Sequence, residues 1–153
     1  MRKTCLVIAL AVLMTVPAAA FAQEAQLEIL RSDVRAEKVA LITEMMEFTD
    51  EQAEVFWPVY RDMENEVDKL TDQRIALIKE YAENYDEMTD KAATDIVTKA
   101  IKLREKRLAI EKKYYKKFSK ALDPITAAKF YQINSELSKL IDLQVSAGLP
   151  FFK

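Results

Sequence analysis

Apolar side chains recur every three, four or seven residues along most of the chain, with charged side chains between them. This spacing places the apolar residues on one face of an α-helix. The first predicted helix runs from about Ala25 to Met46, with apolar positions Leu27, Leu30, Val34, Leu41, Met45 and Phe48. The second follows from Thr49, with apolar positions Ala53, Phe56, Tyr60, Met63, Val67, Leu70, Leu77, Ile78 and Tyr81. Both segments are therefore predicted to be amphipathic helices.

The start of the second helix is marked by the segment Phe48-Thr49-Asp50-Glu51-Gln52. The Thr49 hydroxyl can accept a hydrogen bond from the backbone N–H of Gln52, and the Gln52 side chain can accept one from the N–H of Thr49. Together these bonds form a capping box. The two acidic residues of the first turn are favourable beside the positive end of the helix dipole, and Phe48 can pack as a hydrophobic staple. Local chemistry alone thus predicts a helix start at Thr49.

A break between the second and third helices is predicted at residues 83–89, where asparagine, aspartate and threonine favour turns and helix caps. The third helix is predicted to begin at Thr89 and to reach about Ala121. A connection this short makes the second and third helices antiparallel neighbours. Counting outward from the turn places Tyr60 opposite Tyr114. The two segments are therefore predicted to form a long helical hairpin.

The fourth helix is predicted to begin with Asp123 as its N-cap and Pro124 in the first helical position. Its apolar face continues up to Gly148, which ends it. The chain has one glycine in total, and only three of its four prolines follow the first 22 residues. Turn residues for β-hairpins are therefore nearly absent. The predicted fold class is all-α, with four helices.

Residues 1–22 have the features of a secretory signal peptide. Arg2 and Lys3 precede an apolar run from Leu6 to Val16, and Ala20-Phe21-Ala22 forms a cleavage signature. The run is too short for a transmembrane anchor, which needs about 20 apolar residues. Cleavage after residue 22 would leave residues 23–153 as a single helical domain. No later segment reaches the length of a membrane span, so we expect an exported protein without membrane insertion.

Charge is distributed unevenly along the predicted hairpin. Residues 44–68 hold nine acidic side chains and one basic one, whereas residues 99–120 hold ten basic and two acidic ones. Because the hairpin lays these segments side by side, ion pairs between the helices are one explanation. The other is a binding surface, since the third helix carries a lysine stripe and a broad apolar arc interrupted by Arg104 and Arg107. An apolar arc edged with cations can bind a partner.

The residues of the third helix predicted to contact a partner combine cations with aromatic rings. They are Arg104, Arg107, Lys113, Tyr114, Tyr115, Lys117 and Phe118. For Tyr114 and Phe118, burial in the hairpin core is the competing interpretation, because the same spacing suits packing against the second helix. Lysines beside aromatic residues also resemble an interfacial membrane helix, although the long antiparallel partner argues against insertion.

The composition excludes several classes of function. The chain has no histidine, and its single cysteine, Cys5, lies in the predicted leader. Zinc or copper sites built from these residues, and Ser-His or Cys-His pairs, cannot form. The isolated Gly148 rules out a glycine-rich nucleotide loop. We therefore expect no enzyme activity, no cofactor and no metal. Removing Arg2 and Lys3 leaves 21 Lys and Arg against 25 Asp and Glu, and this net acidic charge, with export, argues against nucleic acid binding.

Two short segments resemble the LTxxQ motif of the Spy/CpxP family of periplasmic proteins. The first is residues 48–52, with Phe48 in place of the usual leucine, followed by Ala53, Phe56 and Trp57. The second is residues 122–126, where Asp123 still caps but Thr126 stands at the position of the glutamine. The matching motif residues, to which we assign a structural capping role, are Phe48, Thr49, Gln52, Leu122 and Asp123.

The resemblance implies a periplasmic protein that forms a thin, Spy-like cradle, an antiparallel homodimer of helical hairpins with a basic and apolar concave face. Members of this family act as ATP-independent chaperones or as envelope-stress adaptors. Some relatives sense metals, a role that the lack of histidine weakens. The expected function is binding of unfolded or partly folded periplasmic proteins. The alternative is a regulatory module that docks on the periplasmic domain of a membrane stress sensor.

Overall fold

Four α-helices and short connections make up the computed structural model, which describes the backbone of residues 17–151 and the side chains of residues 31–151. The helices are α2 (Pro17–Met46), α3 (Asp50–Asn84), α4 (Asp90–Ala121) and α5 (Pro124–Ala147). No strand occurs among the described residues, and the all-α prediction is confirmed. The predicted leader lies largely outside the described residues, and cleavage after Ala22 would remove the first residues of α2.

The chain divides into two compact units between Leu41 and Ile42, a boundary that falls inside α2. In the first unit, the described backbone is the helical stretch from residue 17 to residue 41. The second unit contains the end of α2 and the whole of α3, α4 and α5. Every residue that the sequence predicts to contact a partner belongs to the second unit.

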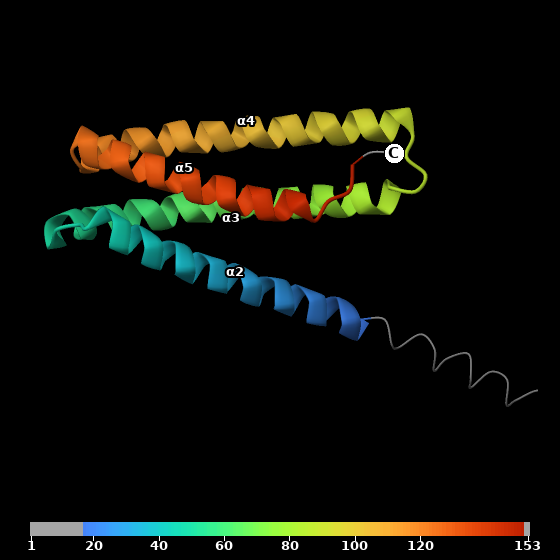
Figure 1. Cartoon of the computed structure of the whole chain (residues 1–153), viewed down its shortest axis with the longest axis horizontal. Coiled ribbons are helices and arrows are strands. Elements are labelled where there is room, and N and C mark those ends of the chain that lie inside the picture. The colour runs from blue at the N-terminus through green and yellow to red at the C-terminus, as the bar shows by residue number, and fades with distance from the viewer. Residues whose placement is uncertain (1–16, 152–153) are drawn as a thin grey trace, which may run out of the picture. The chain divides into compact units, whose positions relative to one another are not determined.

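Helices α3 and α4 form the predicted antiparallel hairpin, joined by residues 85–89 (Figure 1). Its bridging side-chain pairs are Lys113–Glu66, Lys106–Gln73 and Lys99–Glu80. Tyr114 also donates to Glu66 at 2.8 Å, so it contacts a residue further along α3 than the predicted partner, Tyr60. The difference arises because helical side chains lean toward the N-terminus of their own helix. For a given residue of α4, the residue of α3 that it contacts therefore has a higher number than a count from the turn predicts.

Helix α5 runs back along the hairpin of α3 and α4 (Figure 1). Near its start, the ring of Tyr131 lies against that of Tyr115 of α4, with the centroids 5.7 Å apart. Near its end, Asp142 forms a salt bridge with Arg74 of α3. Helix α5 therefore contacts both α4 and α3 near its start, where the ring of Phe130 lies 4.9 Å from that of Phe56, and α3 near its end.

The core of the second unit is a cluster of aromatic rings from three helices. Phe56 of α3, Phe118 of α4 and Phe130 of α5 have ring centroids 5.1, 4.9 and 4.6 Å apart. Tyr60 stacks on Phe56 at 5.6 Å. Phe48 lies 4.4 Å from Phe56, so the residue predicted as a hydrophobic staple packs on this cluster. Such ring pairs contribute about 0.5–1.5 kcal/mol each beyond the area they bury, so the cluster holds the three helices together at this end of the hairpin.

The end of α2 packs through a different face from the predicted one. Ile42 is fully buried and Met46 nearly so, whereas Met45, which the apolar pattern placed inside, is 48% exposed. The prediction for Met45 is therefore wrong. Met46 lies four residues after Ile42, just as Met45 lies four after Leu41, so both pairs fit the helical period and tertiary packing decides between them. Glu47 then leaves the helix with φ of 52°, the left-handed conformation that commonly follows a helix end.

The predicted starts of α3 and α4 are confirmed in atomic detail. The Thr49 hydroxyl accepts from the N–H of Gln52 at 3.3 Å, and Gln52 Oε1 accepts from the N–H of Thr49 at 3.2 Å, which completes the capping box. The Thr89 hydroxyl accepts from the N–H of Ala92 at 3.2 Å. Each cap satisfies backbone donors that the first turn of a helix leaves without partners.

The start of α5 is capped more completely than the sequence predicts. Asp123 Oδ1 accepts from the N–H groups of Ile125 and Thr126, at 3.0 and 2.9 Å. The Thr126 hydroxyl donates to Asp123 Oδ2 at 2.5 Å. Thr126 therefore bonds the side chain of the N-cap residue, whereas Gln52 bonds the backbone N–H of its N-cap residue, Thr49. The bond from this hydroxyl, followed by those from the backbone, lowers the pKa of Asp123.

Candidate interaction surface on helix α4

Tyr114 and Phe118, which were predicted to contact a partner, belong to the hairpin core. Their exposed fractions are 2% and 1%, and Phe118 is part of the aromatic cluster. Rings buried in this way cannot meet another protein unless the hairpin opens. Their prediction as partner contacts is therefore corrected, and burial against α3 is the interpretation that holds.

Tyr114 is held by a charged network at the edge of the core. Its hydroxyl donates to Glu66 Oε1 at 2.8 Å, and Lys113 Nζ lies 2.5 Å from the same oxygen. Lys117 Nζ lies 4.6 Å from the centroid of the Tyr114 ring, a cation–π distance. Burial, then the bond to Glu66, raises the pKa of Tyr114 to about 12. The bond from Lys113, then that from Tyr114, lowers the pKa of Glu66. Lys113 and Lys117 are thus engaged within the hairpin.

Replacing Glu66 by glutamine is expected to lower the free energy of unfolding by about 1 kcal/mol at neutral pH, because it removes the charge from this network. The pKa of Glu66 is lower in the folded protein than its usual 4.5, so the carboxylate stabilises the fold above that value. This stabilisation is lost as the pH falls through the folded pKa. Urea unfolding followed by Trp57 fluorescence should show the difference at neutral pH and its progressive loss as the pH falls below 4.5. A difference that stays constant would contradict the assignment.

A stripe of apolar side chains remains uncovered along α4. It consists of Val97, Ile101, Leu108 and Tyr115, which are 46%, 50%, 47% and 39% exposed; we call it the α4 stripe. Ile101, Leu108 and Tyr115 are separated by seven residues, so they share one face of the helix. Tyr115 follows the buried Tyr114 and lies about 100° further round the helix. The stripe therefore borders the core without belonging to it.

Several cations that have no ion-pair partner among the described residues accompany the α4 stripe. Those that form no salt bridge with any described residue include Lys102, Arg104, Lys112, Lys116 and Lys120, all exposed. Arg104 lies on the stripe between Ile101 and Leu108, whereas Arg107 is bound to Glu111 at 3.3 Å. Within the described part of the chain, Lys113–Glu66 is the salt bridge that joins residues 44–68 to residues 99–120. Ion pairing across the hairpin thus accounts for few of the cations.

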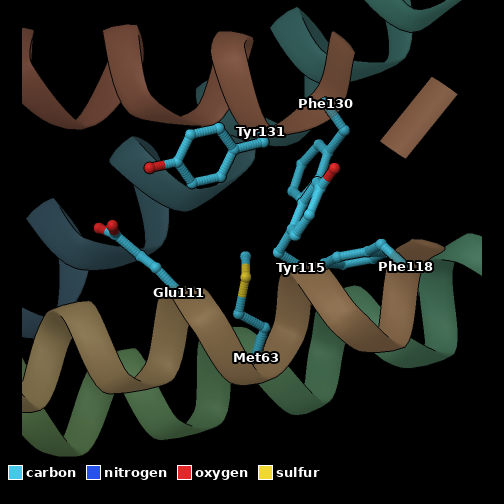
Figure 2. Close-up of a pocket in the computed structure, with 6 residues that line it drawn as sticks. All are labelled: Met63, Glu111, Tyr115, Phe118, Phe130 and Tyr131. Atoms are coloured by element: carbon cyan, nitrogen blue, oxygen red, sulfur yellow. The ribbon is translucent and has the colours of Figure 1, made fainter. Parts of the chain in front are cut away.

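A small pocket lies where the stripe ends, at the junction of α3, α4 and α5. It is lined by Met63, Glu111, Tyr115, Phe118, Phe130 and Tyr131, as Figure 2 shows. Its volume is about 10 Å³, the space of about one water molecule. This pocket is therefore a gap in the packing beside the stripe and is too small for a larger ligand.

The predicted surface and the observed one overlap only in part. Arg104, Lys113, Tyr115 and Lys117 are exposed and Arg107 is half-buried, but two of these four exposed side chains serve the Tyr114 network. Ile101 and Leu108 were not among the predicted partner contacts, although both are exposed on this helix. Their seven-residue spacing to Tyr115 is the signal that distinguishes them from the core side of the arc.

The structure shows neither a candidate membrane span nor a candidate metal site among the residues it describes. No helix in this part of the chain is long and apolar enough to cross a bilayer. No group of three or more Asp, Glu, His or Cys side chains in the same residues could hold a metal ion.

The five motif residues all lie at helix ends or against them. Thr49, Gln52 and Asp123 form caps, Phe48 packs on the aromatic cluster, and the N–H of Leu122 closes the end of α4 by donating to the Phe118 carbonyl at 2.8 Å. Their capping role explains the motif spacing without reference to a ligand. Comparison of the chain with protein-family models, with curated proteins and with solved structures gives no match.

Proposed function

We propose that this protein is an exported, ATP-independent chaperone that holds unfolded or partly folded proteins at the α4 stripe. The observation that carries the proposal is a row of half-exposed apolar side chains beside cations that have no ion-pair partner among the described residues. Exposed apolar surface rimmed by polar groups is typical of a site that binds other proteins. No part of the proposed role requires a cofactor or a catalytic residue.

The size of the stripe favours weak and reversible capture. Full burial of a large apolar side chain contributes about 1.5–3 kcal/mol. The stripe residues already hide about half of their surface, so three such contacts would contribute on the order of 3 kcal/mol before the cost of ordering the client. A client held this weakly can leave without an energy source.

The cations give the surface a preference among clients. Arg104 lies on the stripe, and Lys102, Lys112 and Lys116 are exposed on the same helix. Their charge would attract acidic unfolded segments and speed their encounter with the stripe. We therefore propose that acidic, apolar segments are bound in preference to basic ones.

The proposal that the protein acts in the periplasm rests on the sequence. Residues 1–22 resemble a signal peptide, and residues 48–52 and 122–126 resemble the LTxxQ motif of the Spy/CpxP family. The homodimer implied by that resemblance is part of the proposal. A dimer would present two copies of the α4 stripe to one client.

Suppression of aggregation tests the proposed function. The protein, purified after export, would be mixed without ATP with several chemically unfolded model proteins, and light scattering would be followed. We expect suppression by the wild type and its loss in the double variant Ile101→Ser/Leu108→Ser, because the apolar contact area is removed. No suppression of any client by the wild type would overturn the proposal.

The matched control is Ile125→Ser. Ile125 is an apolar residue at the start of α5 that is 83% exposed. Its replacement therefore also exchanges an exposed isoleucine for serine, but outside the stripe. It should suppress aggregation like the wild type. Circular dichroism must show that each variant keeps its helix content, and equal loss in the control would argue against a role specific to the stripe.

A further inference from the structure

We propose that the α4 stripe accepts its partner segment as an α-helix, and that this helix is amphipathic and acidic along its flanks. The inference rests on the proposed function and deepens it, since it specifies the conformation and charge of what is bound. It is carried by the spacing of the stripe, by the path of α5 and by the arrangement of charges along α4.

The spacing of the stripe matches a helix better than an extended strand. Ile101, Leu108 and Tyr115 repeat every seven residues, and Val97, Arg104 and Glu111 each lie four residues before one of them. This alternation of three and four is the pattern of a helix–helix seam. Seven residues of helix rise about 10.5 Å, whereas side chains on one face of a strand repeat about every 6.6 Å. A second helix with the same repeat can therefore contact each of the three stripe residues Ile101, Leu108 and Tyr115 in turn, whereas the side chains of a strand fall out of step with them.

The path of α5 leaves this seam open. Tyr131 covers Tyr115 at one end of the stripe. Further along, α5 is attached to α3, through the Asp142–Arg74 salt bridge and the hydrogen bond of 2.8 Å from Tyr81 Oη to the Pro150 carbonyl just beyond the helix. Ile101 and Leu108 thus remain half exposed.

The charges along the seam argue against a second copy of α4 as the occupant. In an antiparallel pair centred on Leu108, Arg104 would face Lys112 of the other copy, and Glu105 would face Glu111. In a parallel pair, Arg104 would face its own counterpart, and so would Glu111. Like charges placed opposite each other are unfavourable. Because Arg104 and Lys112 have no ion-pair partner within the described residues, a helix with acidic flanks fits better.

Two synthetic peptides of identical composition test the inference on the purified protein. One carries leucines in a heptad pattern over three heptads with glutamates at the flanking positions, which also keep it from self-pairing. The other carries the same residues with leucines alternating as in a strand. Fluorescence anisotropy would give the affinities, and circular dichroism would follow the helicity of the peptides.

We expect the heptad peptide to bind at least about tenfold more tightly than the alternating one and to gain helix on binding. Ile101→Ser/Leu108→Ser should abolish binding and Ile125→Ser should not. Equal affinities, or binding without a gain of helix, would overturn the inference while the aggregation assay could still support the chaperone. Binding to vesicles of anionic phospholipid would also be measured, for the wild type and for the stripe variants. If the stripe variants weaken vesicle binding and neither peptide binds, the inference fails in favour of a membrane surface.

Discussion

Replacing Phe118 by alanine is expected to lower the free energy of unfolding by about 3–5 kcal/mol. The ring is 1% exposed and lies between Phe56 and Phe130, at centroid distances of 5.1 and 4.6 Å, so its removal leaves a cavity shared by three helices. Domains are typically stable by only about 5–15 kcal/mol, and the loss is therefore large. Urea unfolding followed by circular dichroism and Trp57 fluorescence would measure it.

Leu108→Ala is the matched control for this change. Leu108 lies on the same helix but is 47% exposed, so its truncation should cost about 1 kcal/mol or less while weakening client capture. The two variants thus separate stability from binding. If Phe118→Ala were as stable as the wild type but had lost capture, Phe118 would belong to the binding surface and the corrected assignment would fail.

Ile42→Ala is expected to produce the second large effect, a loss of about 3 kcal/mol. Ile42 is fully buried at the end of α2, and the same turn is linked to α5 because Lys129 Nζ donates to the Met46 carbonyl at 3.4 Å. Truncation would remove buried apolar contacts at the end of α2 and leave a cavity there. Thermal or urea unfolding would give the change in stability.

Met45→Ala distinguishes the observed face of α2 from the predicted one. Met45 is 48% exposed, so its truncation should cost less than about 1 kcal/mol. The apolar pattern of the sequence predicts the opposite order, with Met45 inside. A larger loss of stability for Met45→Ala than for Ile42→Ala would therefore support the buried face of α2 that the sequence predicts and contradict the packing described for this turn.

Features of the fold that depend on neighbouring residues could be predicted from the sequence. The Thr49 cap is closed by Gln52 and the Asp123 cap by Thr126, each within three residues. Helix starts that are fixed by such short-range hydrogen bonds do not depend on the rest of the molecule. For the same reason, the hairpin could be inferred from the short connection between α3 and α4.

Features that depend on distant contacts could not be predicted. The choice between Tyr114 and Tyr115 as the buried ring is a choice of about 100° around α4, and it depends on which face of α4 packs against α3. The part of α4 that then stays exposed depends on the path of α5, which is set partly by the contact between Arg74 and Asp142, 68 residues apart. No local pattern encodes such a contact, so the sequence located the apolar arc of α4 but not which edge of it stays open.

The local closure of the helix starts also bears on how quickly the chain can fold. Caps completed within three residues lower the cost of the first helical turn, which is the unfavourable step of helix formation. Helical chains dominated by contacts between near neighbours fold in microseconds to milliseconds. If export delivers the chain unfolded, the chain would then bury its aromatic core soon after arrival. A chaperone of the kind that we propose would then expose its own core residues only briefly.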